Sequence, residues 1–525
     1  MILACALAAL FAWQNGRAAY KAHQSFVVDD AYITLRYARH LADGAGAVWN
    51  ADERVEGYTS LLAVVLIASL HRLGLDLPDG ALMVNLAGFV LLVGAVFCYG
   101  FRISRGLTRA PVVLVPTLIV ASYPPLYVWI HGRLEGPLFA GLVAVALLAT
   151  TMLLEEPERR SRQAASALTL GVLTLVRPDG GFFGLAGALF VFAACARRGW
   201  MGARDYARFA LLALMLPAAH TAFRLFYYGE WLPNTVYAKA TGLPTAHLLD
   251  TGLAYAAEFA TAGPYVPLVA LLLTPFALIR RERWWPVAYL AVSAAGYCAV
   301  VVMAGGDHMA AHRLLLPLVA PLAMLCAEGL AGFTSRADRA ELRAAAASLA
   351  GALLVVVVPA ARYYRAEVPD PAAYIGTIVG EHLRANYQPG TLVALHTAGS
   401  TPYFAPDLRF IDMLGLNDSH IAHRQIDRLE LYAQRWPGHA KGDGNYVLER
   451  QPDVIILGPA EGTNPDEPFL LSDIELGQSS RFAAEYVFRE HIIDVTSKPD
   501  YAIVRATRRG WLRLQLYERK AADDR

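Results

Sequence analysis

The chain is short of charged residues and of cysteine, and both shortages restrict the class of protein it can be. Charged residues make up 17% of its 525 residues, whereas a soluble globular domain carries about 25%. All five cysteines lie inside apolar runs, so the polar segments offer neither a disulfide framework nor a zinc-finger spacing. With 56% hydrophobic residues, the composition argues against a soluble or disulfide-stabilised protein and favours a membrane protein.

The sequence also lacks internal repeats, a low-complexity tail and a nucleotide-binding glycine fingerprint, and nothing in it points to a nucleic-acid partner. A transporter often consists of two related halves with charged residues in the middle of its helices. Here the conspicuous charges lie in loops, and no charged segment has a second copy. A lipid or solute transporter, or flippase, therefore stays the alternative hypothesis, and a membrane-anchored interaction protein is a further one.

Long apolar runs recur through the first two-thirds of the chain, for example at 138–154 and 348–361. Because a bilayer core requires roughly 20 apolar residues per helix, these runs predict about 11 to 13 membrane-spanning helices. The first run, residues 1–13, is short for a span and lacks the basic leader of a clear signal peptide. We interpret it as a first membrane helix.

Arginines indicate how these helices are oriented. They cluster between apolar runs at 159–162, 197–208, 280–283 and 336–343. The positive-inside preference predicts that these clusters face the cytoplasm. The loops that contain HGRLEG, RPDGG, FYYGEWLPNTVYAK and GGDHMAAHR then face outward, together with the first loop at about 14–57 and the C-terminal 160-odd residues.

The number of crossings after the first loop conflicts with this orientation. Three apolar runs, at roughly 58–74, 81–101 and 111–130, lie between the first loop and HGRLEG. An even number is needed if both loops face outward. Four prolines in the third run predict that it is broken or re-entrant, which a membrane protein tolerates where the backbone lines a protein cavity.

The composition changes to that of a soluble domain at Arg362. We therefore expect a membrane domain at 1–361 and a small α/β domain at 362–525. Four short segments read as strands, at 391–398, 408–414, 453–458 and 501–508, and a helical pattern at 372–387 precedes the first of them.

Two adjacent carboxylates, Asp29 and Asp30, stand at the start of an amphipathic pattern. Ile33, Tyr37 and Leu41 repeat every four residues and form one apolar stripe. This pattern predicts a helix that lies in the membrane interface, with its cations toward phosphate headgroups. Helix capping explains one aspartate, but it leaves the second without a structural reason.

Further ionisable residues occur in the other outward loops. Ionisable groups at membrane depth are costly and usually mark a pathway or a site, although each of them alone is equally compatible with a surface loop or a helix cap. Together they provide a carboxylate to accept the proton of an acceptor hydroxyl and cations to hold a departing phosphate. The acids are Glu56, Glu135, Asp179 and Asp307, and the nearby cations are Arg133, His308, His312 and Arg313.

Several segments, in this order, resemble bacterial membrane glycosyltransferases of the C-type superfamily (GT-C), nearest to the mycobacterial terminal arabinofuranosyltransferases. The segments run from Asp29 to about Asp418 and read DDAYITLRYARHLADGAGAVWNADERVEGYTS, RPDGG, YYGEWLPNTVYAK, GGDHMAAHRLLLPL and FIDMLGLND. The resemblance implies a polytopic helical enzyme with an extracytoplasmic C-terminal α/β domain in a bacterial inner membrane. It also implies an active site that faces the periplasm.

The resemblance further implies that a sugar passes from a polyprenyl-phosphate donor to a glycan, lipid or protein acceptor of the cell envelope. Arabinofuranose is the sugar we expect. The catalytic or metal-coordinating acid maps to Asp29 or Asp30, and the VEGYT segment matches at Glu56. The candidates for binding donor phosphate or substrate are Arg36, Arg133, Glu135, Lys239, Asp307, His308, His312 and Arg313.

Three points stay open at this stage. Lys239 can bind a phosphate or extend beside Tyr237 toward the membrane surface. His308 and His312 have an i,i+4 spacing that suits a divalent metal if a helix continues there, with Asp30 as a further weak candidate. His396, Asp412, Asn417 and Asp418 either approach the acceptor or form strand ends and turns. We favour the second reading for these four residues.

Overall fold

A computed structural model describes residues 27–105, 109–199, 201–262, 265–335, 370–498, 502 and 504–521. The chain forms two compact units. Among the described residues, the membrane unit comprises 82–105, 109–199, 201–222, 252–262 and 265–335, and the sheet unit comprises 27–81, 223–251, 370–498, 502 and 504–521. Residues 27–57 of the first outward loop and the 226–239 loop therefore fold with the C-terminal residues. The expected boundary at 361/362 lies outside the described residues and stays a prediction.

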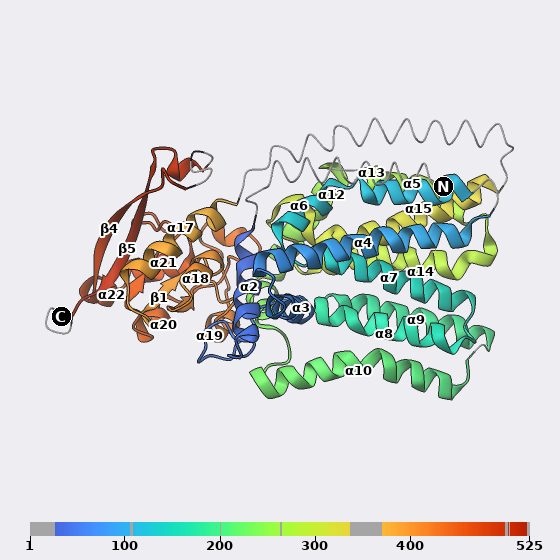
Figure 1. Ribbon diagram of the computed structural model, residues 1–525, viewed down its shortest axis with the longest axis horizontal. Coiled ribbons are helices and arrows are strands. Elements are labelled where there is room, and N and C mark those ends of the chain that lie inside the picture. The colour runs from blue at the N-terminus through green and yellow to red at the C-terminus, as the bar shows by residue number, and fades with distance from the viewer. Residues whose placement is uncertain are drawn as a thin grey trace. The chain divides into compact units, whose positions relative to one another are not determined.

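The membrane unit is helical, and Figure 1 shows its long helices running side by side. α4, α10 and α12 cross from one unit into the other along the chain. The helices of this part of the chain are α4 (Leu77–Ile103), α5 (Arg109–Ala121), α6 (Pro124–Gly132), α7 (Gly136–Glu155), α8 (Arg160–Val176), α9 (Gly180–Arg198), α10 (Ala203–Tyr228), α12 (Thr245–Ala262), α13 (Tyr265–Ala277), η2 (Arg281–Arg283), α14 (Trp284–Met303), η3 (Ala310–Leu318) and α15 (Val319–Thr334).

Six helices among the described residues are long and apolar enough to cross a membrane, or seven if the bent pair α5–α6 is one span. The chain is thus a multi-pass membrane protein. The number is below the predicted 11 to 13, partly because some apolar runs form helices too short for a span, such as α13 with 13 residues. The predicted first and last spans, at 1–13 and 348–361, lie outside the described residues.

The structure also explains the odd number of runs after the first loop. The 58–74 run forms only α3 (Leu61–Arg72), whose 12 residues extend about 18 Å, against about 30 Å for a bilayer core. The third run is broken, as predicted, into α5 and α6, which are bent by 44°. Without α3, the spans between the first loop and HGRLEG are α4 and, if the bent pair is one span, α5–α6, which makes the even number required.

Two ends of the membrane unit have different chemistry. The HGRLEG and RPDGG loops meet at one end of α7, where Arg177 Nη1 lies 2.8 Å from Glu135 Oε1. At the other end of α7, Arg283 pairs with Glu155. These two loops thus share one end of α7, and the 280–283 arginine cluster lies at the other. Which end faces the periplasm stays a prediction.

The sheet unit is built on a five-stranded mixed sheet. Its strand order is β2-β1-β3-β5-β4, in which β1 pairs in parallel with β2 and β3, whereas β5 is antiparallel to β3 and β4. The strands are β1 (Leu392–Leu395), β2 (Arg409–Asp412), β3 (Val454–Ile455), β4 (Tyr486–Asp494) and β5 (Trp511–Arg519). The helices are α2 (Asp29–Ala42), α3, α11 (Asn234–Ala240), α17 (Pro371–Asn386), α18 (Ser400–Phe404), α19 (Ser419–His423), η5 (Ala433–Arg435), α20 (Gly444–Glu449), α21 (Leu471–Gly477), α22 (Ser480–Glu485) and η7 (Arg505–Thr507).

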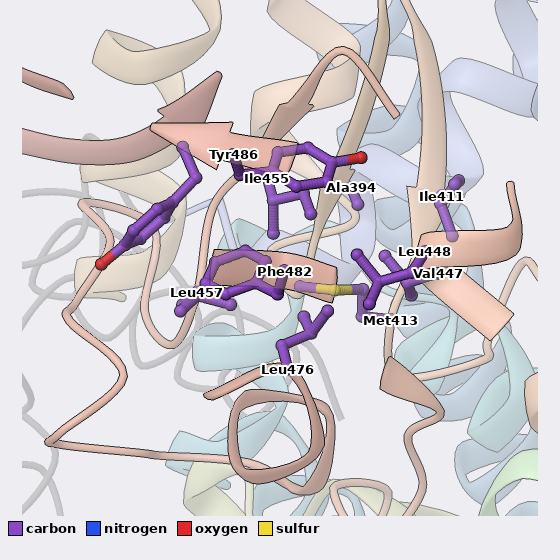
Figure 2. Close-up of a cluster of buried hydrophobic side chains, with 11 residues drawn as sticks. Ala394, Ile411, Met413, Val447, Leu448, Ile455, Leu457, Leu476, Phe482 and Tyr486 are labelled. Atoms are coloured by element: carbon purple, nitrogen blue, oxygen red, sulfur yellow. The ribbon is translucent and has the colours of Figure 1, made fainter. Parts of the chain in front are cut away.

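A core of buried apolar side chains lies between the sheet and helices α20–α22. Figure 2 shows Ala394, Ile411 and Ile455 from the strands close to Phe482 and Leu476 from the helices. The alternation of side chains in a strand directs every second residue to this face. The helix predicted at 372–387 and the first three predicted strands are confirmed by α17, β1, β2 and β3.

The fourth predicted strand, at 501–508, is wrong. Its Arg505–Thr507 segment is a 3₁₀ turn in the connection between β4 and β5. These two strands were missed, although Leu512, Leu514 and Leu516 of β5 alternate with more polar residues and are buried. That alternation is the usual sign of a half-buried strand.

The prediction of an interfacial helix at α2 also needs correction. The whole segment Ala31–Ala38 of α2 is buried, and Tyr37 of the supposed lipid-facing stripe is fully enclosed. α2 packs on α3, α17 and α18 in the sheet unit. Protein rather than lipid therefore covers its apolar stripe.

Glycine permits a close helix crossing in the membrane unit. A Cβ atom on Gly88 of α4 would collide with the backbone of Leu138 in α7, and one on Gly141 would collide with the backbone of Gly88. Small residues at such crossings let helix backbones approach closely, and this packing stabilises helix pairs in membranes.

We expect Gly88→Ala to lower the thermal unfolding midpoint of the detergent-solubilised protein, because the α4 and α7 backbones must separate. Gly94→Ala, in the same helix, is the matched control, since no atom lies within 4 Å of a Cβ there. Fluorescence-detected size exclusion after heating measures both variants. Equal midpoints for the two variants would show that the crossing does not limit stability.

Candidate active site

Asp29 is the first residue of α2, and its carboxylate is held by the loop that follows β1. Gly399 N donates to Asp29 Oδ2 at 3.0 Å, while the backbone N and the Oγ of Ser400 donate to Oδ1 at 2.7 and 2.6 Å. The approach requires glycine at position 399, since a Cβ there would collide with the Asp29 carbonyl oxygen. Asp29 thus attaches the start of α2 to the C-terminal part of the sheet unit.

A second carboxylate completes this attachment. Asp29 N donates to Asp370 Oδ2 at 2.9 Å, and Asp370 also caps α17 by accepting from Ala372 N at 3.0 Å. Burial and the nearby Asp370 carboxylate raise the pKa of Asp29 to about 7, against the opposing effect of the Ser400 hydrogen bonds. Burial also raises the pKa of Asp370. With both oxygens occupied, Asp29 is suited to positioning rather than to proton transfer.

Asp30 has a different environment from its neighbour. Its Oδ2 lies 3.6 Å from Lys239 Nζ, and 24% of the Asp30 side chain and 32% of the Lys239 side chain are exposed. An incoming molecule can reach both groups. A carboxylate beside an ammonium can accept a proton while the cation binds an anion.

The loop after β2 holds the helix that carries Lys239. Asn234, the first residue of α11, donates from Nδ2 to the carbonyl oxygens of Gly415, Leu416 and Asp418 at 2.8, 3.0 and 3.2 Å. The Asp30–Lys239 pair therefore depends on two loops, 396–400 and 412–418, which both follow parallel strands. Such carboxyl-end loops are common ligand sites in α/β sheets.

Asp412 shapes the second of these loops. It is fully buried and accepts hydrogen bonds from Leu414 N and from both nitrogens of Asn417 at 2.8 to 3.0 Å. Burial raises the pKa of Asp412 to about 6. Asp418 caps α19 through Ile421 N. These are turn and cap residues, as favoured from the sequence.

Glu56 does not occupy a catalytic position. It is 2% exposed, and Arg224 binds both its carboxylate oxygens, Oε1 at 3.1 Å through Nη2 and Oε2 through Nε. Its backbone oxygen accepts from Asn234 N at 3.0 Å. This buried bidentate ion pair corrects the catalytic assignment of Glu56, because a proton acceptor must be reachable by the substrate.

Arg36 is likewise structural, which corrects its assignment as a phosphate ligand. Its guanidinium donates to the carbonyl oxygens of Trp49 at 2.8 Å and Leu408 at 3.2 Å, and also to that of Pro402. The side chain is buried between the rings of Trp49 and Phe410. A guanidinium with these partners is not available to a lipid phosphate.

The membrane unit gathers a second group of ionisable residues at the Glu135 end of α7. Arg177 contacts Glu135 and also Asp179 Oδ1, at 3.0 Å. Asp179 Oδ2 accepts from Tyr297 OH at 2.8 Å. The two loops predicted to face outward thus form one hydrogen-bonded network, in which Arg177 is the central cation.

Asp307 and Arg313 form a close ion pair in the same unit. Arg313 Nε lies 2.6 Å from Asp307 Oδ2, and its guanidinium lies 5.4 Å from the centre of the Trp129 ring. His308 Nδ1 lies 3.6 Å from Asp307 Oδ1. Asp307 therefore orients two of the predicted phosphate ligands.

The predicted histidine pair does not share a helix face. Ala311 and His312 have left-handed backbones, with φ of 57° and 49°, so no regular helix links His308 to His312. His312 Nε2 instead lies 3.8 Å from Glu258. In the part of the chain that the structure describes, no group of three His, Cys, Asp or Glu residues is arranged to hold a metal ion.

The chain near the Glu135 end of α7 contains residues with strained backbone conformations. Arg133, another predicted phosphate ligand, closes α6 with a φ of 62°. Non-glycine residues with positive φ are uncommon and persist where the surrounding structure determines them, often at functional sites. Arg133, Ala311 and His312 are three such residues in loops at this end of the membrane unit.

Curated relatives match part of the chain. The terminal β-(1→2)-arabinofuranosyltransferase of Corynebacterium glutamicum is 28% identical over 364 residues, which cover 61% of this chain and 50% of that protein. The enzyme of the same name from Mycobacterium tuberculosis is 28% identical over 360 residues, covering 61% and 54%. The chain spans about half the length of these relatives, and the resemblance noted in the sequence is confirmed.

The C-terminal part and the fold have matches of their own. Residues 362–522 match a family described as a domain of unknown function, DUF8728. The crystal structure of the Archaeoglobus fulgidus oligosaccharyltransferase, in complex with Zn and sulfate, superposes with a TM-score of 0.57 at 11% identity, covering 94% of this chain and 69% of that chain. The chain has a GT-C fold.

Within this GT-C fold, sequence reasoning found Asp29, Asp30 and Lys239 but missed the groups that hold them. Asp370, Gly399 and Ser400 lie more than 340 positions from Asp29. Gly399 and Ser400 lie in the loop after β1, and nothing in their local sequence indicates the hydrogen bonds that tie this loop to α2. Arg177 carried a weak signal, because it stands in the RPDGG segment beside Asp179.

We expect Arg36→Met to destabilise the sheet unit of the GT-C fold, because three buried carbonyl oxygens lose their donor. Each unsatisfied buried polar group costs about 1–3 kcal/mol. Limited proteolysis of the sheet unit, followed with temperature, measures the loss. Arg39→Met is the comparison, since Arg39 is only partly buried and its guanidinium makes one hydrogen bond, to Tyr403 O at 2.9 Å; equal effects would refute the role of Arg36.

The raised pKa of Asp29 predicts a pH dependence of stability. Since the folded pKa is about 7 and the unfolded pKa is about 3.9, the folded state binds the extra proton between these values. The stabilising contribution of Asp29 is therefore largest at low pH and is lost as the pH rises toward 7. The wild-type unfolding midpoint minus the Asp29→Asn midpoint should decrease as the pH is raised from 5 to 8. A constant difference would contradict the raised pKa of Asp29.

Proposed function

We propose that this protein is a membrane glycosyltransferase that moves a sugar from a polyprenyl-phosphate donor to a glycan acceptor of the bacterial cell envelope. The observation that carries the proposal is the partly exposed Asp30–Lys239 pair, with Asp30 next to the anchored Asp29. The GT-C fold and the likeness to two terminal arabinofuranosyltransferases support it.

In the proposed reaction, Asp30 acts as the general base. Its carboxylate takes the proton of an acceptor hydroxyl, and the hydroxyl oxygen forms a bond with the anomeric carbon of the donor sugar. The bond between that carbon and the phosphate oxygen breaks, and polyprenyl phosphate leaves with the electron pair. Lys239 binds the negative charge that develops on the departing phosphate.

The surroundings of Asp30 suit this role. Lys239 Nζ lies 3.6 Å from the Asp30 carboxylate, and both side chains are partly exposed. The neighbouring Asp29 fixes the first turn of α2 through three hydrogen bonds, which limits the movement of Asp30. A positioned base of this kind contributes about 10²–10⁴ to the rate. Asp29 is thus a positioning residue in the proposal.

The polar group of the membrane unit supplies further candidates. Arg133, His308 and Arg313 stay proposed ligands for the donor phosphate, with Asp307 orienting the last two. Glu135 is proposed to orient Arg177, and His312 is the least suited of the set because rings of Tyr255 and Phe259 surround it. A divalent metal stays a proposal for which the described residues offer no three-ligand site.

The finer details follow from the relatives' names. Arabinofuranose is the proposed sugar, since both curated relatives are named for its transfer. We place the protein in the bacterial inner membrane, with the sheet unit and the Asp30 side chain toward the periplasm. A glycan is the proposed acceptor, and lipid or protein acceptors are alternatives for the same chemistry.

The test uses purified protein in proteoliposomes, with a radiolabelled polyprenyl-phosphate arabinofuranose donor and an arabinan oligosaccharide acceptor. We expect Asp30→Asn to lower kcat at least 100-fold, because the amide cannot take the proton. We expect Lys239→Gln to lower kcat/KM by about tenfold or more, since the phosphate loses a cation. Labelled product on the acceptor is the readout.

Asp43→Asn is the matched control, because Asp43 is an exposed aspartate directly after the same helix. It should keep wild-type turnover. Turnover of Asp30→Asn within threefold of wild type would remove Asp30 as the base. Movement of the radiolabelled donor across the bilayer, without transfer of its sugar to the acceptor, would instead support a transporter.

A further inference from the structure

A pocket opens on the membrane unit at the end of α7 that carries Glu155. It has a volume of about 390 Å³ and lies between the end of α13, the η2 turn and the first residues of α14. The lining residues are Ala277, Leu278, Arg280, Arg281, Trp284 and Val287. The wall is therefore mainly apolar and includes two arginines.

The charges around this pocket leave a positive surplus. Arg283 is buried and directed inward, where it binds Glu328 and Glu155, and Arg102 binds Glu155 at 2.8 Å. Arg280 lies 3.4 Å from the exposed Glu282 and 3.8 Å from Glu328. Arg102, Arg280 and Arg283 thus balance the three glutamates, and Arg281 is a fourth arginine among the described residues of this group.

Arg281 accounts for this surplus. Its side chain is exposed, and it forms no ion pair with any residue that the structure describes. Because the neighbouring acids already have arginine partners, an added anion meets a net attraction at Arg281. The pocket therefore favours a negatively charged group over a neutral or cationic one.

The apolar side of the pocket continues onto the outer surface of the bundle. The exposed fraction is 56% for Trp284, 51% for Leu278 and 71% for Leu271, which lies seven residues before Leu278. Exposed apolar side chains of this size, in a helix bundle that crosses a membrane, face acyl chains. Tryptophan is enriched where the hydrocarbon region meets the headgroups, so Trp284 places the guanidinium groups at headgroup level.

The pocket is separate from the polar group proposed to bind the donor. Arg283 contacts Glu155 at the last residue of α7, whereas Arg177 contacts Glu135 just before its first residue. The 20 residues of α7 separate these ends by about 30 Å, the thickness of a bilayer core. A molecule bound in the pocket thus lies in the opposite leaflet from the Glu135 end.

We propose that this pocket binds the headgroup of an anionic phospholipid. The lipid phosphate is held by Arg281 and Arg280, and one acyl chain lies along Leu278, Trp284 and Val287. Basic pockets at one membrane surface bind acidic headgroups in this way. The inference is independent of the proposed transferase reaction.

Native mass spectrometry of the detergent-solubilised full chain tests the proposal, with phosphatidylglycerol and phosphatidylcholine of identical chains as probes. We expect wild type to retain phosphatidylglycerol preferentially. Arg281→Gln should weaken phosphatidylglycerol binding about fivefold, the effect of one arginine near an anionic lipid surface, and should leave phosphatidylcholine binding unchanged.

Arg160→Gln is the matched control, because Arg160 is also an exposed arginine in a cluster between helices but does not line the pocket. It should bind both lipids like wild type. Equal losses in the two variants, or no preference of wild type for phosphatidylglycerol, would overturn the proposal. An unchanged unfolding midpoint of Arg281→Gln in lipid-free detergent confirms that any loss is a loss of binding, and a lowered midpoint would assign Arg281 a structural role instead.

Discussion

The anchoring of the Asp29 carboxylate to the loop after β1 is the interaction on which the candidate site depends. Three hydrogen bonds from Gly399 and Ser400, together with the bond from Asp29 N to Asp370, join the first turn of α2 to residues far along the chain. Without them, the start of α2 would be a free helix end beside a loop. With them, Asp30 has a defined direction toward Lys239.

Twin aspartates at one helix start thus have divided roles. Placing two carboxylates side by side costs energy, because like charges repel and burial disfavours ionisation. The structure reduces this cost by giving Asp29 hydrogen-bond donors and Asp30 a cation. Asp29 positions the start of the helix, and Asp30 stays accessible. A capping role explains only the first of them, which is why the sequence left the second without a structural reason.

The same division between structural and accessible charges recurs elsewhere. Arg36 and Glu56 stand in the motif that suggested a glycosyltransferase, yet both are buried in complete sets of partners. The charged residues of this motif thus include some that stabilise the fold rather than form the site. In the membrane unit, Glu328 and Arg283 likewise pair with each other, whereas the neighbouring Arg281 is exposed and has no ion-pair partner among the described residues.

By itself, the sequence determined the class of the protein, the polytopic helical part and the sheet in the C-terminal part, which follow from composition, apolar run length and short strand-like segments. The resemblance to GT-C enzymes suggested Asp29, Asp30 and Lys239 as site residues, and their roles stay proposals. Only the tertiary structure decided which residues are accessible. Strand pairing brings loops 396–400 and 412–418 to α2 and α11, and a contact across more than 340 positions leaves no periodic signal. Among the described residues, run length alone also gave more spans than the structure has, because the length of a helix such as α3 appears only when the chain is folded.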